Sequence, residues 1–147
     1  MEGLPFHTLP IRLCFELTED ELICLEDVKR SVEILQQKGY SIAIDDFGVG
    51  YCNLSYLQEL NANFIKIDKI FIEKLETNTV NEKLLPAIID IAHNVGAEII
   101  VEGIETKKQG EMLRTLGVEY GQGYYFSKPM TIDEILQWKV VDRLQKY

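Results

Sequence analysis

The sequence predicts an α/β fold in which short parallel strands alternate with helices. Short apolar runs recur along the chain, and segments with a helical repeat of apolar residues separate them. The runs are apolar throughout, which is typical of parallel strands covered on both faces by helices. Polar residues, most of them acidic, follow these runs. On these patterns alone, a βα barrel and an open doubly wound sheet both remain open.

Length and composition fit one globular domain over residues 1–147. Hydrophobic residues make up 46% of the chain, charged residues make up 27%, and the formal net charge is −9. This charge disfavours binding to nucleic-acid polymers, since such proteins need a basic surface. No apolar run approaches the roughly 20 residues that cross a membrane, and we expect no signal peptide. Three cysteines without metal-type spacing favour a reducing, cytoplasmic location.

The first half of the chain predicts three strands. Arg12–Leu17 is the first apolar run, and a helix follows over Leu25–Lys38, where apolar residues form one stripe. The second strand is Ser41–Ile44. A glycine-containing loop then leads to a short helix over Leu54–Leu60. The third strand is Phe64–Ile67.

The second half of the chain predicts two more strands and three helices. A helix is predicted over Val80–Val95, and Pro86 within it predicts a kink or a late start. The later elements are a strand over Glu98–Val101, a helix from Thr106 to Gly117, a short strand within Tyr120–Phe126 and a helix from Ile132 to about Leu144. Thr106 and Gln109 have the spacing of a capping box, which supports the start of a helix at Thr106.

Almost every predicted strand ends in an acid, a lysine or an amide. In chain order they are Glu16 and Glu19, Asp45 and Asp46, Lys66 and Asp68, Glu102 and Glu105, and Gln122. The carboxyl ends of parallel strands lie on one side of the sheet, and in barrels they converge on one mouth. A single acid at such a position is more often a turn or cap residue. Acids at four strand ends, together with a lysine, are hard to explain as caps.

Clustered carboxylates favour a bound divalent cation, because like charges raise one another's pKa unless a cation compensates them. An all-oxygen ligand set favours Mg²⁺, Mn²⁺ or Ca²⁺ over a thiolate zinc site. The adjacent acids Asp45 and Asp46 can each reach a different ion, or one of them can bridge two. Two ions about 3.5–4 Å apart activate water for attack on phosphorus, and a nearby lysine such as Lys66 orients that water or stabilises negative charge. The residues therefore indicate metal-assisted phosphoester hydrolysis.

Five sequence motifs follow one another at set distances. They are FELTE at 15–19, IAIDDFGVGYCNLSYL at 42–57, FIKIDKIFI at 64–72, IIVEGIET at 99–106 and YGQGYYFSKPM at 120–130. In order and spacing the chain from Arg12 to Met130 resembles the EAL domain family of cyclic-di-GMP phosphodiesterases. Linked motifs argue against another class of metal-dependent barrel enzyme, such as an enolase-type lyase.

The resemblance implies a chemistry and a set of residue roles. Family members hydrolyse one phosphodiester bond of cyclic-di-GMP to give linear pGpG, use Mg²⁺ or Mn²⁺, are inhibited by Ca²⁺ and often dimerise. The implied metal ligands are Glu16, Asp45, Asp46 and Glu102. The implied catalytic residues are Lys66, which contacts the attacking water, and Glu102, a metal ligand or general base. Gln122 is implied in the substrate pocket, Glu19 in anchoring the DDFG loop and Glu105 in support.

The chain departs from the family at its amino-terminal side. Family domains are (β/α)₈ TIM-type barrels, whereas this sequence predicts about five βα units, a partial barrel and an incomplete EAL domain. The strand with the EAL motif and the strand with an asparagine ligand are absent. We therefore expect impaired activity in the isolated chain, and either a homodimer or association with a chain that supplies the missing barrel half. A non-catalytic binding or interaction module in cyclic-di-GMP signalling is the alternative.

Overall fold

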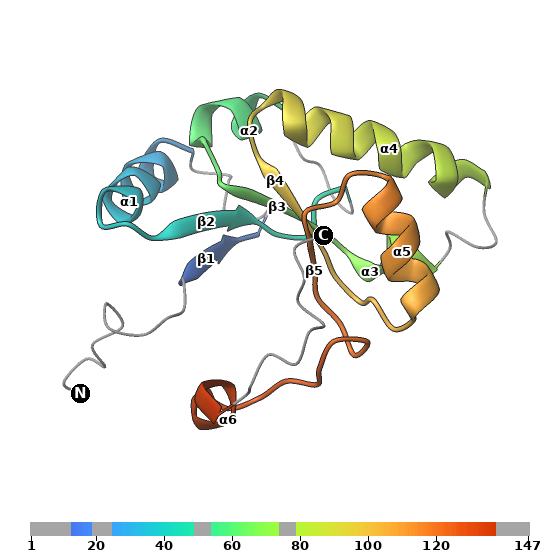
Figure 1. The fold of residues 1–147 in the computed structure, drawn as a ribbon. Coiled ribbons are helices and arrows are strands. Elements are labelled where there is room, and N and C mark those ends of the chain that lie inside the picture. The colour runs from blue at the N-terminus through green and yellow to red at the C-terminus, as the bar shows by residue number, and fades with distance from the viewer. Residues whose placement is uncertain (1–12, 19–24, 49–53, 74–78, 138–147) are drawn as a thin grey trace.

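The computed structural model describes residues 13–18, 25–48, 54–73 and 79–137, and within them five strands form one parallel sheet (Figure 1). The strands are β1 (Cys14–Leu17), β2 (Ser41–Ile44), β3 (Phe64–Ile67), β4 (Glu98–Val101) and β5 (Tyr120–Gly121). The helices are α1 (Leu25–Gln37), α2 (Leu54–Leu60), α3 (Lys69–Glu73), α4 (Thr79–Asn94), α5 (Lys107–Thr115) and α6 (Ile132–Gln137). The predicted α/β class is confirmed.

The strands lie side by side in chain order, β1-β2-β3-β4-β5, and every neighbouring pair is parallel. A doubly wound sheet reverses its strand order at a switch point, and the described strands contain no such reversal. Each βα connection instead places the next strand on the same side of the previous one, which is the winding of a βα barrel. The structure thus decides between the two architectures that the sequence pattern left open.

The two faces of the sheet differ in composition. One face carries six apolar side chains that are each at most 1% exposed: Ile42, Ile44, Ile65, Ile67, Ile99 and Val101. They form one core with residues of the helices, among them Val32 of α1, Leu57 of α2 and Leu85 of α4. Burial of each such side chain stabilises the fold by about 1.5–3 kcal/mol. This core holds the sheet against the helices. The residues that lie between these apolar residues in each strand point to the opposite face of the sheet.

Several elements differ from their predicted form. Helix α3 was not predicted, because five residues are too few to show a helical repeat; Asp68 Oδ1 accepts a hydrogen bond from Ile70 N at 2.8 Å and starts it. Helix α4 already begins at Thr79, so the late start that Pro86 predicted is wrong. The buried face of α4 outweighs the unfavourable effect of a proline within a helix. Helix α6 is described to Gln137, and the rest of its predicted span lies outside the described residues.

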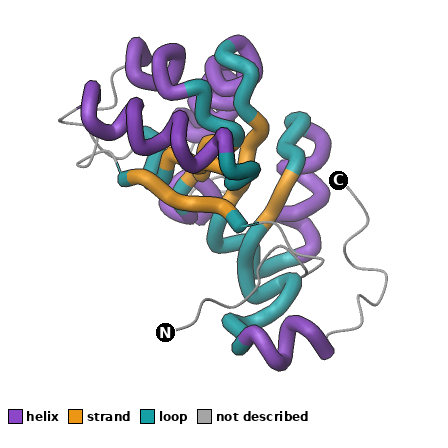
Figure 2. Tube along the Cα trace, turned by 90° about the vertical axis from the view of Figure 1, so that its left-hand side faces the viewer, coloured by secondary structure: helices purple, strands orange, loops and turns teal. Residues whose placement is uncertain are grey.

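Strand β1 is an edge of the described sheet. It pairs with β2 alone among the described strands, and Cys14, Phe15 and Glu16 are exposed. Apolar sequence neighbours such as those of Cys14 favour a buried small hydrophobe, but Cys14 is exposed on this edge strand. Figure 2 shows that α6 also lies apart from the sheet and the other helices, as in Figure 1. In the part of the chain that is described, no helix has the length and apolar character needed to cross a membrane.

Candidate active site

Lys66 is the one charged residue in the described part of the chain that is buried. It lies in β3, the central strand, and its side chain is 5% exposed. Its Nζ lies 2.7 Å from Glu102 Oε1, 2.8 Å from Glu16 Oε2 and 3.0 Å from Asp45 Oδ1. Glu16 lies in β1, Asp45 directly follows β2 and Glu102 directly follows β4. The cluster therefore lies at the carboxyl ends of the strands.

Strand register explains why these side chains meet. Glu16 of β1 is opposite Ala43 of β2, and the next residue of β2 on the same face is Asp45. Lys66 is opposite Ile100 of β4, so the next residue on that face is Glu102. Ala43 is fully buried and small, which leaves space for the long lysine side chain beside it. Alternation along parallel strands therefore places all four charged groups on one face.

The ammonium of Lys66 has three N–H donors, and three carboxylates accept from it. Burial alone would lower the pKa of Lys66, but hydrogen bonds to Glu102, Glu16 and Asp45 outweigh burial and raise this pKa above its ordinary value of 10.5. Lys66 is consequently charged at neutral pH. One positive and three negative groups leave the cluster with a formal charge of 1 − 3 = −2.

Asp46 lies next to the cluster but takes no part in it. Its backbone is left-handed, with φ of 55°, and its N–H donates to Asp45 Oδ1 at 3.0 Å. Asp46 thereby helps to hold the side chain of Asp45. Within the described residues, no ion pair joins the Asp46 carboxylate to Lys66. The loop that follows Gly48 lies outside the described residues.

Gln122 is placed beside Glu102 by backbone hydrogen bonds that continue the β4–β5 ladder. Gln122 N donates to Val101 O at 2.8 Å, and Ile104 N donates to Gln122 O at 3.1 Å. Gln122 is exposed at the same edge as the cluster. Glu105 N donates at 2.9 Å to Gln109 Oε1, the same oxygen that accepts from Thr106 N in the capping box of α5. The predicted capping box is confirmed. Glu19 lies outside the described residues.

Gly103 is a site-forming residue that the sequence reasoning did not single out. It follows Glu102 directly, its φ is 70°, and a Cβ there would lie 2.3 Å from Cβ of Lys69. The β4–α5 loop therefore packs against the start of α3, and this contact sets where Glu102 leaves its strand. A glycine directly after a strand-end acid was the signal in the sequence.

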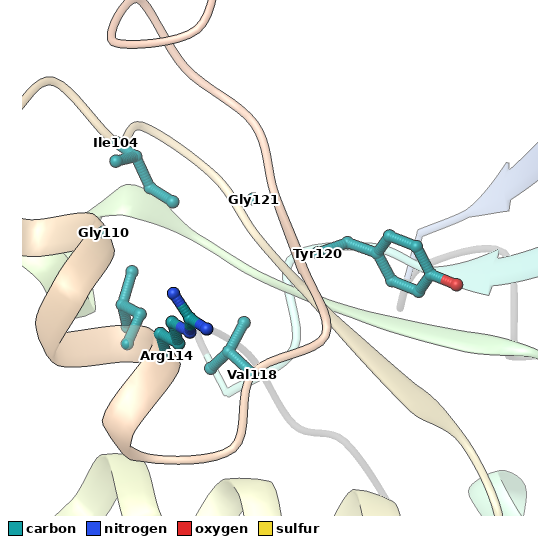
Figure 3. Close-up of a pocket in the computed structure, with 7 residues that line it drawn as sticks. Ile104, Gly110, Arg114, Val118, Tyr120 and Gly121 are labelled. Carbon is teal, nitrogen blue, oxygen red and sulfur yellow. The ribbon is translucent and has the colours of Figure 1, made fainter. Parts of the chain in front are cut away.

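Two hollows of the described structure lie away from this cluster. One has a volume of about 10 Å³ and lies between α5 and β5. Its lining residues, drawn in Figure 3, are Ile104, Gly110, Leu113, Arg114, Val118, Tyr120 and Gly121. Its volume is too small for a ligand, since one water needs about this much space. A wider hollow of about 630 Å³, lined in part by Ser41, Asn63 and Glu98, lies at the amino ends of β2, β3 and β4. The charged cluster is at the opposite strand ends.

A divalent cation suits the donors at this edge by chemistry, because carboxylate oxygens are the ligands that hard cations prefer. The arrangement of these described carboxylates in the structure, however, does not form a metal site. In the described residues, no three or more His, Cys, Asp or Glu side chains are placed so that they could hold a metal ion. The carboxylates of Glu16, Asp45 and Glu102 are instead directed at Lys66.

Comparisons with known proteins point to one family. The EAL domain model matches residues 6–129. The chain is 42% identical over 136 residues to the probable cyclic di-GMP phosphodiesterase PdeB of Escherichia coli, a match over 90% of this chain and 25% of that protein. It is 36% identical over 133 residues to the probable cyclic di-GMP phosphodiesterase PdeG of the same organism, over 90% of this chain and 26% of that protein.

Solved structures give the same picture. The PaMucR phosphodiesterase in its c-di-GMP complex matches with a TM-score of 0.76 and 35% identity, over 84% of this chain and 50% of that one. The EAL domain of Mycobacterium smegmatis DcpA matches with a TM-score of 0.77 and 33% identity, over 84% of this chain and 56% of that one. The chain thus spans about a quarter of these curated relatives and about half of these solved chains.

Proposed function

The chain belongs to the EAL domain family, and from this premise we propose that it forms part of a domain that hydrolyses cyclic-di-GMP to linear pGpG. The observation that carries the proposal is the cluster of Lys66 with Glu16, Asp45 and Glu102 at the carboxyl edge of the sheet. Barrel enzymes keep their catalytic groups at this edge. Two relatives are named as probable cyclic di-GMP phosphodiesterases, and one solved neighbour is a c-di-GMP complex.

EAL phosphodiesterases depend on divalent metal ions, and for this chain we propose Mg²⁺ or Mn²⁺. Glu16, Asp45, Asp46 and Glu102 would supply carboxylate oxygens. When bound, such ions supply Lewis-acid activation of water and of phosphoryl oxygens. The carboxylates of this chain would hold and orient the charged site.

Lys66 and Gln122 would act on the substrate side of the same edge. The Lys66 ammonium would orient the attacking water and stabilise negative charge that develops on the phosphoryl oxygens. The Gln122 side chain is exposed beside Glu102, where it can hydrogen-bond to a bound nucleotide. Glu102 would bind the metal or accept the proton of the attacking water. For Glu105 we propose support of the Glu102 loop, and for Glu19 support of the loop that begins with Asp45 and Asp46.

Among the described strands, β1 pairs with β2 alone, and Phe15 on β1 is 43% exposed. An unpaired edge strand of this kind is a template for pairing with further strands. We propose that βα units of the missing barrel half cover this edge and add ligands, either from a second copy in a homodimer or from another chain. The isolated chain would then be impaired in catalysis.

A non-catalytic role in cyclic-di-GMP signalling is the second candidate for the isolated chain. It is favoured by the closed arrangement of the described carboxylates around Lys66, with no preformed group that could hold a metal ion. A binding or interaction module needs the fold and the edge of the sheet but does not need a working metal centre.

One assay separates these functions. The purified chain is incubated with cyclic-di-GMP and Mn²⁺, and pGpG is followed by chromatography, with Glu102→Gln as the control. Formation of pGpG that Glu102→Gln abolishes would support an enzyme. Absence of turnover at micromolar protein would contradict independent catalysis. Sedimentation of the same sample would show whether an active species is a dimer.

A further inference from the structure

Strand β5, which is followed directly by Gln122, is the shortest strand of the described sheet. It has 2 residues, whereas each of the other described strands has 4. Gly121 and Gly123 flank Gln122. Glycine weakens a strand, because it loses more conformational freedom on ordering than other residues and has no side chain to pack. We therefore expect β5 to open locally unless a further contact attaches it to its neighbours.

Glu119 supplies such a contact directly before β5. Its Oε2 accepts a hydrogen bond from Ile99 N of β4 at 2.8 Å, and its Oε1 lies 2.8 Å from Nε2 of His93 in the last turn of α4. Ile99 is 0% exposed, so water does not replace this acceptor while the strands stay closed. A buried N–H without an acceptor is strongly unfavourable. The Glu119 carboxylate thus ties the start of β5 to both β4 and α4.

His93 orients this carboxylate. An ionised carboxylate only accepts hydrogen bonds, so the ring nitrogen of His93 supplies the hydrogen in their contact. The His93 ring also lies against the turn before β5, since its Cε1 is 3.9 Å from the position that a Cβ of Gly117 would take. The side chains of His93 and Glu119 are 40% and 31% exposed, and such an exposed pair adds little stability. We therefore assign to His93 the orientation of the carboxylate, and to the buried Ile99 N–H the larger energetic part.

The contact of Glu119 with β4 lies on the same pair of strands that places Gln122. Gln122 N donates to Val101 O at 2.8 Å, and Ile104 N donates to Gln122 O at 3.1 Å. With a rise of about 3.3 Å per residue, Gln122 lies about 10 Å along the strand from Glu119. The two hydrogen bonds of the Gln122 backbone form only while β5 stays against β4. The attachment at the start of β5 therefore bears on the position of Gln122 at its end.

We propose that Glu119, oriented by His93, is a positioning residue that anchors β5 to β4 and thereby holds Gln122 at the carboxyl ends of the strands. The proposal deepens the proposed function, on which it rests for the role of Gln122 toward substrate. The anchoring itself does not depend on that function. Removal of the carboxylate leaves Ile99 N without its acceptor, so that β5 opens locally while the pairing of the strands before β4 is kept.

The test is amide hydrogen exchange at constant pH, followed residue by residue by NMR in the full chain. Glu119→Ala removes the acceptor, whereas Glu119→Gln keeps an oxygen for the N–H of β4. Glu111→Ala is the matched control, since Glu111 makes an exposed ion pair with Lys107 at 3.4 Å on the neighbouring helix α5. In Glu119→Ala we expect the amides of Gln122 and Ile104 to exchange about tenfold faster or more. In Glu119→Gln and Glu111→Ala we expect them to exchange as in the unmodified chain.

A reference amide separates local opening of β5 from a general loss of stability. Asn63 N donates to Ile42 O at 2.9 Å between β3 and β2, and its exchange should change little in Glu119→Ala. Equal acceleration at Gln122 and Asn63 would overturn the proposal, because Glu119 would then stabilise the whole fold. Unchanged exchange at Gln122 would show that the ladder holds β5 without Glu119. Equal acceleration in Glu119→Gln and Glu119→Ala would overturn the assignment of the anchor to this hydrogen bond.

A second variant leaves Glu119 in place and does not depend on the folding of Glu119→Ala. His93→Phe keeps a ring beside Gly117 but lacks the nitrogen that contacts the carboxylate. We expect exchange at Gln122 to rise by a smaller factor, about twofold to fivefold, as loss of an exposed pair predicts. Unchanged exchange would overturn the role of His93. The proposed function fails separately: absence of pGpG from the unmodified chain would overturn the hydrolase function and leave the anchoring of β5 standing.

Discussion

Substitution of Gly103 by alanine tests how the loop after β4 positions Glu102. Two features of this position oppose any side chain. Its φ of 70° is in the left-handed region, and a Cβ there would lie 2.3 Å from Cβ and 3.3 Å from Cα of Lys69. Lys69 is the first residue of α3, so the obstructing atoms belong to the start of a helix and not to the far end of a flexible side chain.

The expected loss of stability has two parts. A left-handed conformation costs a non-glycine residue about 1–2 kcal/mol. Contact between carbon atoms is favourable only at about 3.5–4.0 Å, so the loop or α3 must move by more than an ångström. Forced repacking of this kind costs about 1–3 kcal/mol. The midpoints of these two ranges add up to about 3.5 kcal/mol. We therefore expect Gly103→Ala to lower the free energy of unfolding by about 3–4 kcal/mol.

Gly39→Ala is a matched control. Its φ is 82°, but no atom lies within 4 Å of the position that a Cβ would take. Urea unfolding followed by circular dichroism should show a loss of about 1 kcal/mol for Gly39→Ala, from backbone strain alone. The difference between the two variants then measures the contact between the loop and α3. Equal losses in the two variants would refute the argument that this contact positions Glu102.

Three further predictions concern the charged cluster and a helix cap. Lys66→Met in buffer with EDTA should lower the free energy of unfolding by about 3 kcal/mol, since removal of one partner of a buried pair costs about 3–5 kcal/mol and the exposed carboxylates reduce this. Lys29→Met, which breaks an exposed pair, should cost less than about 1 kcal/mol, and equal losses in these two variants would contradict the role of the cluster. Because the folded-state pKa of Lys66 is raised above 10.5, its stabilisation is complete below that pH and is lost as pH rises further. The difference in unfolding free energy between the unmodified chain and Lys66→Met should therefore stay constant below pH 10.5 and shrink as pH rises above it, and a constant difference throughout would show that the charge is not responsible. Thr106→Ala should cost about 1 kcal/mol by removing the capping box of α5, whereas Thr115→Ala at the other end of the helix should change the thermal midpoint little, because its hydroxyl bonds only to Glu111 O of its own helix.

Much of the fold was accessible from the sequence because its signals are local. Short apolar runs at Ser41–Ile44, Phe64–Ile67 and Glu98–Val101 became strands with the predicted bounds. The capping box of Thr106 and Gln109 formed as its spacing indicated. Such features depend on residues within one or two turns of each other. Five motifs in order were also enough to predict the EAL family, which the family model then matched.

Other predictions failed or stayed untested where the outcome depends on distant residues. The exposure of Cys14 follows from the place of β1 at an edge of the sheet. The contact of His93 Nε2 with Glu119 Oε1 at 2.8 Å also joins distant residues, and Glu119 Oε2 accepts a hydrogen bond from Ile99 N at 2.8 Å. The predicted roles in binding or catalysis all stay predictions, namely those of Glu16, Glu19, Asp45, Asp46, Lys66, Glu102, Glu105 and Gln122.

The sequence by itself determined that acids and a lysine follow the strands, because each strand and its end are contiguous in the chain. Only the tertiary structure decided that Lys66 pairs with Glu16, Asp45 and Glu102 at once. These four residues are far apart in the sequence, and no local pattern sets the distances between their side chains. Parallel pairing in register and the packing of the helices bring them together, and electrostatic attraction across a poorly hydrated site then directs the carboxylates at the ammonium.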